Sequence, residues 1–328
     1  MKFFLVALAS SFAAQAQAPR NFPQPEPFKQ VTVTEIPGIV AAGSQWKMAW
    51  QGMATADGMA GTKDGGILFA QEQTNTVFKL DKNDKVSPFL TNPHGPGAIA
   101  FGPKGQIFTV ERTCTDPGGK PEQCKEPTDV AVLTPSRKIL ADSVSGKGLG
   151  RVNDIIADRK GNIYYTSGGL FHLDAKGTVT EIGANLRTNG IMLSPDEKTL
   201  YVTNGPVIAA FDVQPDGSAT NQREFGKWDG GGNGDGMAID SNGNLYVTTS
   251  AGIQVLSSQG KYLGLIPTPR AAITVTFSGP KKKLMYVGTM GSIGADGKEV
   301  RTEPGVRNVA MTVYKIPMLS QGYAGRAK

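Results

Sequence analysis

The chain has 328 residues with a formal net charge of +6, and its composition includes 42 glycines and 21 prolines. Its lysines and arginines are scattered and form no basic cluster interleaved with aromatic residues, which argues against nucleic acid as a partner. Past the N-terminus no stretch reaches the roughly 18 apolar residues that a membrane-spanning helix needs, and no feature points to a protein partner. Many short runs of Val, Ile, Tyr and Phe without a long helical period favour a β protein.

The N-terminal residues have the layout of an export signal. An apolar stretch follows Lys2, and small residues follow that stretch. A positive start, a short apolar core and an A-x-A exit are what a signal peptidase needs. The alternative is an apolar N-terminal strand. We predict a signal peptide over residues 1–18, cleaved after Ala16 or Ala18, and therefore an exported protein, either periplasmic or extracellular.

One pattern recurs six times along residues 19–328. An apolar strand is followed by a turn rich in Gly, Asp, Asn or Lys and then by a second strand. The six turns begin at Lys63, Pro103, Arg159, Ser194, Ser241 and Gly279. A third strand and a possible fourth give a unit of about 40 residues, the size of a four-stranded propeller blade. We predict one all-β domain, a six-bladed β-propeller with four-stranded blades, because six in-phase repeats disfavour a β-sandwich. Residues 30–35 are expected to complete the sixth blade.

Two units carry long insertions between their second and third strands, near residues 111–129 and 290–308. Insertions at equivalent positions of a repeat collect on one face, so we expect both to form rims at the same end of the propeller. The first insertion contains Cys114 and Cys124, the two cysteines of the chain. In an oxidising compartment they are expected to form a disulfide. The alternative is a pair of redox or metal-binding thiols.

The residue that opens the innermost strand of each unit is found by counting back from the second strand. These six residues are Asp57, Gly97, Asn153, Asn189, Asp235 and Thr274. Innermost strands line the channel of a propeller, so the six should surround its axis at one depth. Two carboxylates there would repel each other unless a cation lay between them. The all-oxygen set of Asp57, Asn153, Asn189 and Asp235 predicts one divalent metal, with Ca²⁺ first, then Mg²⁺ or Mn²⁺, and Zn²⁺ less suited. Asp57, Asn189 and Asp235 are each followed by a glycine. Taken singly, these Asp-Gly and Asn-Gly pairs could equally be turns.

Three segments of the chain carry motifs beyond the repeat itself. They are Arg151-Val-Asn-Asp154, residues 189–203 and residues 235–246. In this order they resemble three elements of the SMP-30/gluconolactonase/LRE-like family, also called the regucalcin-like lactonases. These elements are its R-x-N-D element, its most recognisable segment and its D-G-x-x-x-D-x-x-G-N-L element. The resemblance implies a six-bladed propeller with an axial divalent metal, held by Asn153, Asn189, Asp235 and the first-blade residue. There Asp57 stands in place of the family's usual glutamate, and residues 274–279 depart from its N-x-x-F-G-G element.

The ring and the resemblance together predict metal-assisted hydrolysis of a small-molecule lactone, such as a sugar lactone. The metal would polarise the ester carbonyl, Asp235 would act as general base toward water, and Arg151 would hold the substrate or its oxyanion. We also expect Glu72, Glu111 and Asn204 at the mouth of the channel. The alternatives are a related phosphotriester hydrolase and a non-enzymatic propeller that binds a metal or a small molecule.

Overall fold

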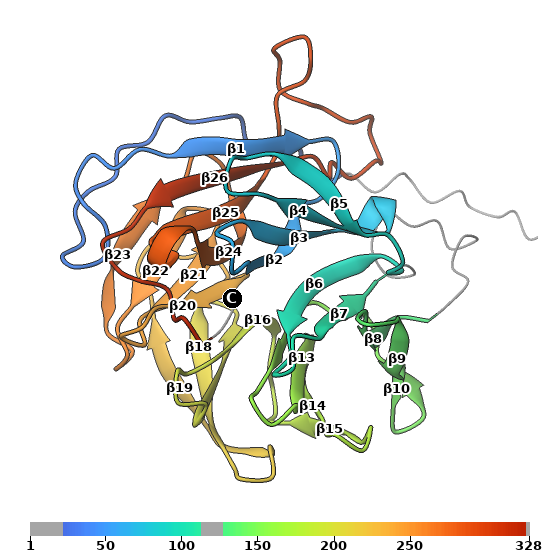
Figure 1. Ribbon diagram of the computed structural model, residues 1–328. Coiled ribbons are helices and arrows are strands. Elements are labelled where there is room, and N and C mark those ends of the chain that lie inside the picture. The colour runs from blue at the N-terminus through green and yellow to red at the C-terminus, as the bar shows by residue number, and fades with distance from the viewer. Residues whose placement is uncertain (1–21, 113–126, 326–328) are drawn as a thin grey trace, which may run out of the picture.

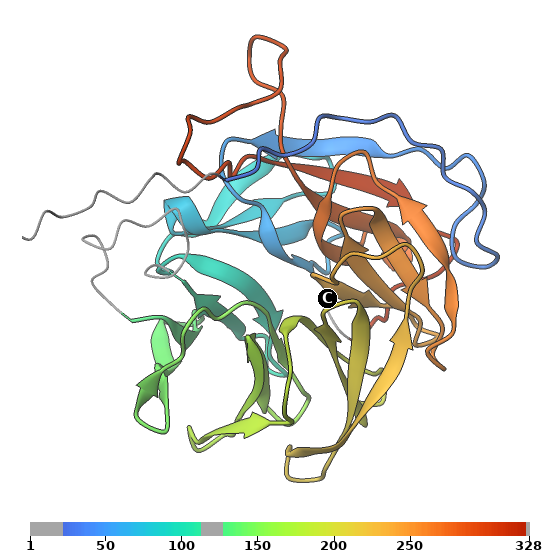
Figure 2. The same ribbon diagram turned by 180° about the vertical axis from the view of Figure 1, so that it is seen from behind.

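The computed structural model describes residues 22–112 and 127–325. Within them the chain forms six four-stranded antiparallel sheets, which are arranged as blades around a central axis (Figures 1 and 2). The predicted six-bladed β-propeller is therefore confirmed. The predicted signal peptide and both cysteines lie outside the described residues.

Blades one to five are each formed by four strands that are consecutive in the chain. Blade one comprises β2 (Asp57–Gly61), β3 (Ile67–Gln71), β4 (Thr76–Leu80) and β5 (Val86–Leu90). Blade two comprises β6 (Pro96–Phe101), β7 (Ile107–Glu111), β8 (Asp129–Val132) and β9 (Lys138–Ala141). Blade three comprises β12 (Ile155–Ala157), β13 (Ile163–Ser167), β14 (Gly169–Leu173) and β15 (Val179–Ile182). Blade four comprises β16 (Thr188–Leu193), β17 (Thr199–Asn204), β18 (Val207–Val213) and β19 (Ala219–Lys227). Blade five comprises β20 (Met237–Ile239), β21 (Leu245–Thr249), β22 (Gly252–Leu256) and β23 (Tyr262–Pro267).

Blade six joins the two ends of the chain. It comprises β24 (Ala272–Ser278), β25 (Leu284–Met290), β26 (Met311–Pro317) and β1 (Lys47–Gly52). Strand β1 pairs with β26 at the outer edge of the blade, so an N-terminal strand closes the ring. The expectation that residues 30–35 would do this is wrong. That segment forms no strand, and Val33 is instead buried in a cluster with Val255 and Ile266 of blade five.

The remaining described elements are short. A two-stranded hairpin joins β10 (Ser143–Val144) to β11 (Lys147–Gly148), and two 3-10 turns are η1 (Glu72–Thr74) and η3 (Pro280–Lys282). Across residues 22–112 and 127–325, no helix is both long and apolar enough to cross a membrane.

Apolar side chains fill the space between adjacent blades. Ile156 and Tyr164 of blade three, for example, belong to the same buried cluster as Ile191 and Val202 of blade four. The burial follows from the alternation of side chains along each strand, which sends every second residue into the interface with one neighbouring blade. Because each blade is held on both sides, the inner strands, which lie nearest the axis in Figure 1, form a rigid frame for the residues at their ends.

Candidate functional site

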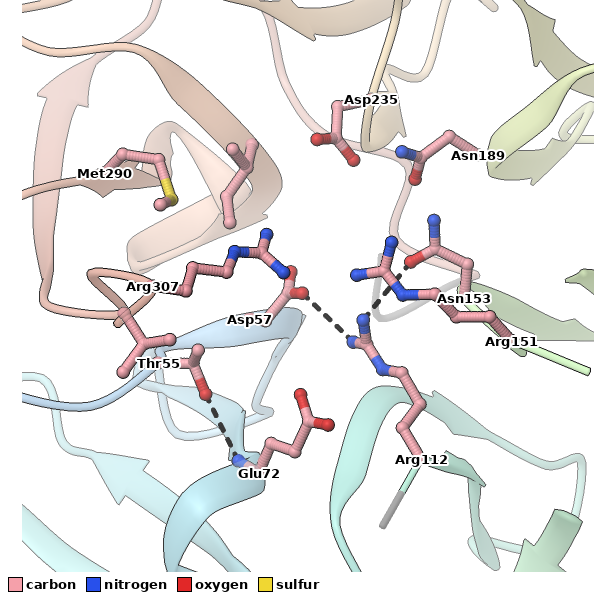
Figure 3. Close-up of a pocket in the computed structure, with 12 residues that line it drawn as sticks. Thr55, Asp57, Glu72, Arg112, Arg151, Asn153, Asn189, Asp235, Met290 and Arg307 are labelled. Carbon is pink, nitrogen blue, oxygen red and sulfur yellow. Dashed lines mark hydrogen bonds and ion pairs between the residues drawn. The ribbon is translucent and has the colours of Figure 1, made fainter. Parts of the chain in front are cut away.

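The entry ends of the inner strands enclose a cavity of about 130 Å³ at the axis. Its lining residues are Thr55, Asp57, Glu72, Arg112, Arg151, Asn153, Asn189, Asp235, Ile273, Met290, Arg307 and Val309. The set includes all four predicted metal ligands, one of which is the predicted general base, and the predicted substrate-holding Arg151. In Figure 3 the four ligand side chains come from different sides and face a common space. The structure therefore brings together the residues that the repeat had placed in one ring.

The glycines after three ring residues allow the inner strands to approach one another closely. A Cβ atom on Gly58 would lie 2.1 Å from the Cα of Ala98 in the next blade, and one on Gly190 would lie 2.1 Å from the carbonyl oxygen of Asp235. Both distances are far below van der Waals contact, so a side chain cannot be accommodated there. The Asp-Gly and Asn-Gly pairs of the ring thus mark close contacts between blades rather than hairpin turns, which was the alternative interpretation of these dipeptides.

Buried threonines of the second strands fix the backbone of the ring. The hydroxyl of Thr166 accepts a hydrogen bond from the Asp154 amide (3.1 Å) and donates one to the Asn189 carbonyl (2.5 Å) of the next blade. The hydroxyl of Thr203 in turn accepts from the Asn189 amide (3.1 Å). Both threonines are fully buried. These bonds satisfy backbone groups that the irregular strand entries would otherwise leave without partners, and they hold the ring residues in place.

Arg112, which sequence reasoning missed, supplies a guanidinium group to the ring. Its Nη2 lies 3.1 Å from Oδ2 of Asp57, and its Nη1 lies 3.4 Å from Oδ1 of Asn153 (Figure 3). Only 4% of its side chain is exposed. A Cβ atom on Gly97, the ring position of blade two, would lie 1.8 Å from Nε of Arg112. The absent side chain of Gly97 therefore makes room for the guanidinium group, and this gap in the ring was the signal that could have revealed it.

The carboxyl group of Asp235 has a strongly perturbed pKa. Its separation from bulk water, followed by the charges of Asp57 and Asp154, raises this pKa to about 8, whereas Arg112 and Arg151 act in the opposite direction. The raised pKa favours the protonated form of Asp235 in the protein alone, and added positive charge in the ring would favour the ionised form.

Asp154 lies behind the ring and joins two blades. Its Oδ1 accepts a hydrogen bond from the Ile155 amide (2.9 Å), and its Oδ2 accepts one from the Ile191 amide (3.1 Å) of blade four. Asp154 is 6% exposed and does not line the cavity. Asp154 thus contributes negative charge near Asp235 while its oxygens bind backbone N–H groups.

The ring fits a hard divalent cation by its donor chemistry. No group of three His, Cys, Asp or Glu side chains that could hold a metal occurs among the described residues, so the ring offers four donors only because two are asparagines. Two carboxylates and two carboxamides are ligands that suit Ca²⁺, Mg²⁺ or Mn²⁺ better than Zn²⁺. Burial, followed by the charges of Asp57 and Asp154, raises the pKa of Asp235, and a cation in the ring would offset both effects.

The three residues expected at the mouth of the channel have different positions. Glu72 lines the cavity as expected. Glu111 does not, because its carboxylate is only 1% exposed and receives the guanidinium of Arg137 at 2.6 Å. Asn204 also lies outside the lining, and its side-chain oxygen accepts a hydrogen bond from the Arg187 amide (2.8 Å). Glu72 is therefore a lining residue, whereas the side chains of Glu111 and Asn204 make local ion-pair and backbone contacts outside the lining.

The segment between β25 and β26 forms part of the cavity wall. It covers most of the predicted insertion near residues 290–308, and it contributes Arg307 and Val309, while Met290 ends β25. In Figure 1 this segment projects beyond the blades. The N-terminal residues contact it, since the Phe28 amide donates to Glu299 (2.9 Å). The other insertion, near residues 111–129, lies largely outside the described residues.

The chain is similar to a family of propeller proteins that includes lactonases. The sequence profile of the SMP-30/Gluconolactonase/LRE-like region matches residues 126–291. A gluconolactonase of Zymomonas mobilis is 28% identical over 295 residues, which cover 76% of this chain and 77% of that protein. A solved gluconolactonase structure from Xanthomonas campestris matches with a TM-score of 0.69 and 19% identity, over 91% of this chain and 99% of the other. The calcium-binding protein regucalcin of Agrobacterium tumefaciens matches with a TM-score of 0.62 and 15% identity, over 92% and 97% of the two chains. At these identities the two structures support the fold alone.

Proposed function

The chain belongs to the SMP-30/gluconolactonase/LRE-like family, and from this premise we propose that it is a divalent-metal-dependent hydrolase that opens a lactone ring. The observation that carries the proposal is the convergence of Asp57, Asn153, Asn189 and Asp235 on one axial cavity. The sequence similarity to a gluconolactonase supports a cyclic ester as substrate. A cavity of about 130 Å³ suits a small molecule.

The four ring residues would hold the cation, and calcium is the first choice because all four donors are oxygens. When bound, such a cation supplies polarisation of the ester carbonyl and a lower pKa for water. A protein described as calcium-binding, regucalcin, shares the fold, and the choice for this chain itself depends on the four oxygen donors.

Asp235 would take the proton from the water that attacks the lactone carbonyl, acting as general base. Burial and neighbouring carboxylates raise its pKa to about 8, so positive charge added to the ring would favour the ionised form that a general base requires. Arg151 lines the same cavity and would donate hydrogen bonds to the oxyanion that forms as water adds. Cleavage of the ring C–O bond, with the proton passed from Asp235 to the leaving oxygen, then releases a hydroxy acid.

We also propose that the protein acts outside the cytoplasm, on the basis of the signal-like layout of residues 1–18. Fractionation of expressing cells followed by N-terminal sequencing tests this. A mature protein that begins at residue 17 or 19 in the exported fraction is the expected result, and an intact N-terminus in the cytoplasm would contradict it.

The hydrolase proposal is tested by pH-stat assay of chelator-treated protein on a panel of aldono- and alkyl lactones. Turnover should appear on addition of Ca²⁺, Mn²⁺ or Zn²⁺, and it should be lost in Asp235→Asn, which keeps the side-chain shape. A phosphotriester in the same panel separates the related hydrolase. If the metal binds but no ester is cleaved, the lactonase proposal is wrong and a binding role replaces it.

A further inference from the structure

We propose that Arg112 is a resident cation of the ring, which competes with a divalent metal for Asp57 and Asn153 and so weakens metal binding. The inference rests on the proposed metal site and adds a residue that sets its affinity. It concerns a side chain that the repeat does not supply, since the residue comes directly after β7 and not at the start of an inner strand.

The guanidinium group of Arg112 already contacts two of the ring donors. It lies 3.1 Å from Oδ2 of Asp57 and 3.4 Å from Oδ1 of Asn153, and these are two of the four oxygen donors of the ring. The other oxygen of Asp57 accepts a hydrogen bond from the Gly58 amide (2.8 Å), and Asn153 has one side-chain oxygen, so a cation held by all four residues would compete with Arg112 for these oxygens. The guanidinium group has hydrogen-bond donors only, in a planar fork that suits two acceptors at once. Arginine and metal are therefore alternative partners for these two side chains.

The ring has a space that the side chain of Arg112 fills. Gly97 occupies the ring position of blade two, and any Cβ atom there would lie 1.8 Å from Nε and 2.3 Å from Cζ of Arg112. The side chain is 4% exposed, so it is not a surface arginine that bends inward by chance. The other five blades have a residue with a side chain at this position, and blade two alone has a glycine there, which leaves the space to the guanidinium of Arg112.

The charge of Arg112 affects the ring both with and without a metal. Arg112 carries a fixed positive charge, because its guanidinium does not deprotonate in proteins. That charge compensates the carboxylates in the absence of metal and repels an incoming divalent cation. Removing the charge should therefore lower the stability of the metal-free protein and raise its affinity for metal. These opposite signs distinguish competition from a role in which Arg112 merely orients the ligands, since loss of an orienting residue would weaken metal binding.

The test is calorimetric titration of chelator-treated protein with Ca²⁺ and with Mn²⁺, alongside thermal unfolding with chelator or with metal. Arg112→Gln should bind metal about tenfold or more tightly than the wild type, the size expected for loss of one unit charge a few ångströms from the site. Its unfolding midpoint should fall below that of the wild type in chelator, and metal should raise the midpoint more in the variant than in the wild type. Arg307→Gln is the matched control, because it removes the same charge from the cavity wall and leaves the Arg112 contacts in place; its effect on metal affinity should be smaller.

Gly97→Ala provides a second route to the same result if Arg112→Gln folds poorly, because the added Cβ atom must displace the guanidinium while the charge stays in the chain. It too should bind metal more tightly than the wild type. Equal or weaker metal affinity in folded Arg112→Gln would overturn the inference and leave the proposed metal site standing. Failure of every protein, including the wild type, to bind either metal would overturn both. Binding by Arg112→Gln alone would be the strongest support.

Discussion

The blades fall into two groups at the axis of the propeller. Blades one, three, four and five supply the oxygen donors, which are Asp57, Asn153, Asn189 and Asp235. Blades two and six instead have Gly97 and Thr274 at the equivalent positions. These two blades also carry the long segments after their second strands, and Arg112 and Arg307 come from those segments. Four blades thus provide oxygens, and the other two each provide a guanidinium group. A third guanidinium group, that of Arg151, comes from the segment that enters blade three.

The difference shows how a symmetric backbone supports an asymmetric site. Thr274 is 3% exposed, and its hydroxyl accepts a hydrogen bond from the Met59 amide of blade one (3.3 Å), so it closes the ring without a polar group for a ligand. Gly97 leaves space for Arg112. The two departures from the repeat therefore have separate physical reasons, and each can be tested against a blade that keeps the Asp or Asn.

The largest effect on activity is expected when the ring residue of an oxygen-donating blade is replaced. Asp235→Asn removes the general base and one negative charge, and kcat on a lactone should fall by about 10²–10⁴-fold. The thermal unfolding midpoint should stay the same or rise in chelator, because the variant removes a carboxyl group whose pKa is raised by burial and by Asp57. Steady-state kinetics and calorimetry measure the two quantities. A variant that keeps a tenth or more of wild-type kcat would show that Asp235 is not the base.

Close approach of the inner strands should give the next largest effect. Gly190→Ala puts a Cβ atom 2.1 Å from the Asp235 carbonyl oxygen, and the strands must separate. We expect a loss of about 1–3 kcal/mol in the free energy of unfolding, the usual cost of overpacking, together with weaker metal binding. Gly148→Ala is the control, because nothing lies within 4 Å of its added Cβ atom; it should change stability by less than about 0.5 kcal/mol. Equal losses in the two variants would contradict the close-approach argument.

The repeat predicted more of the oxygen-donating blades than of the other two. Its regular period was sufficient for the six blades and for the four Asp and Asn side chains, because equivalent strand positions occupy equivalent places around an axis. Arg112 was missed because the ring was predicted only from the residue that opens each inner strand. A long side chain that follows the second strand can reach the same space. The Asp-Gly and Asn-Gly pairs were open to interpretation as turns because positive φ and lack of room both select glycine.

A smaller effect is expected where hydroxyl groups hold the ring of an oxygen-donating blade. Thr166→Val keeps the shape of the side chain and removes the hydrogen bonds to the Asp154 amide and the Asn189 carbonyl. Because the site is buried, the free energy of unfolding should fall by about 1–2 kcal/mol. Denaturant unfolding measures this. Thr180→Val makes the same change at an exposed position of β15 and should have almost no effect, so an equal loss there would mean that the buried hydroxyl is unimportant.

The smallest effect concerns the segment of blade six that carries Arg307, which is held by an ion pair instead of by ring hydrogen bonds. Arg270, whose side chain is 1% exposed, contacts Glu299 through Nη1 at 2.8 Å and Nη2 at 2.9 Å. The hydrogen bond from Arg270 is the main cause that lowers the pKa of Glu299 below its ordinary value of 4.5. A carboxylate with a lowered folded-state pKa stabilises the protein above its unfolded-state pKa, and this contribution is lost as the pH falls through the lower folded value.

Glu299→Gln should therefore lower the free energy of unfolding by about 1 kcal/mol at pH 7, a modest value because Glu299 is partly exposed and the pair is screened by solvent. The difference between variant and wild type should stay constant from pH 7 to about 5 and shrink at lower pH, where wild-type Glu299 is itself protonated. Denaturant unfolding at a series of pH values gives this difference directly. A difference that is the same at pH 7 and pH 3.5 would show that Glu299 acts through its shape and not its charge, and the segment of blade six would then be held in the same way as the uncharged ring contacts of the other blades.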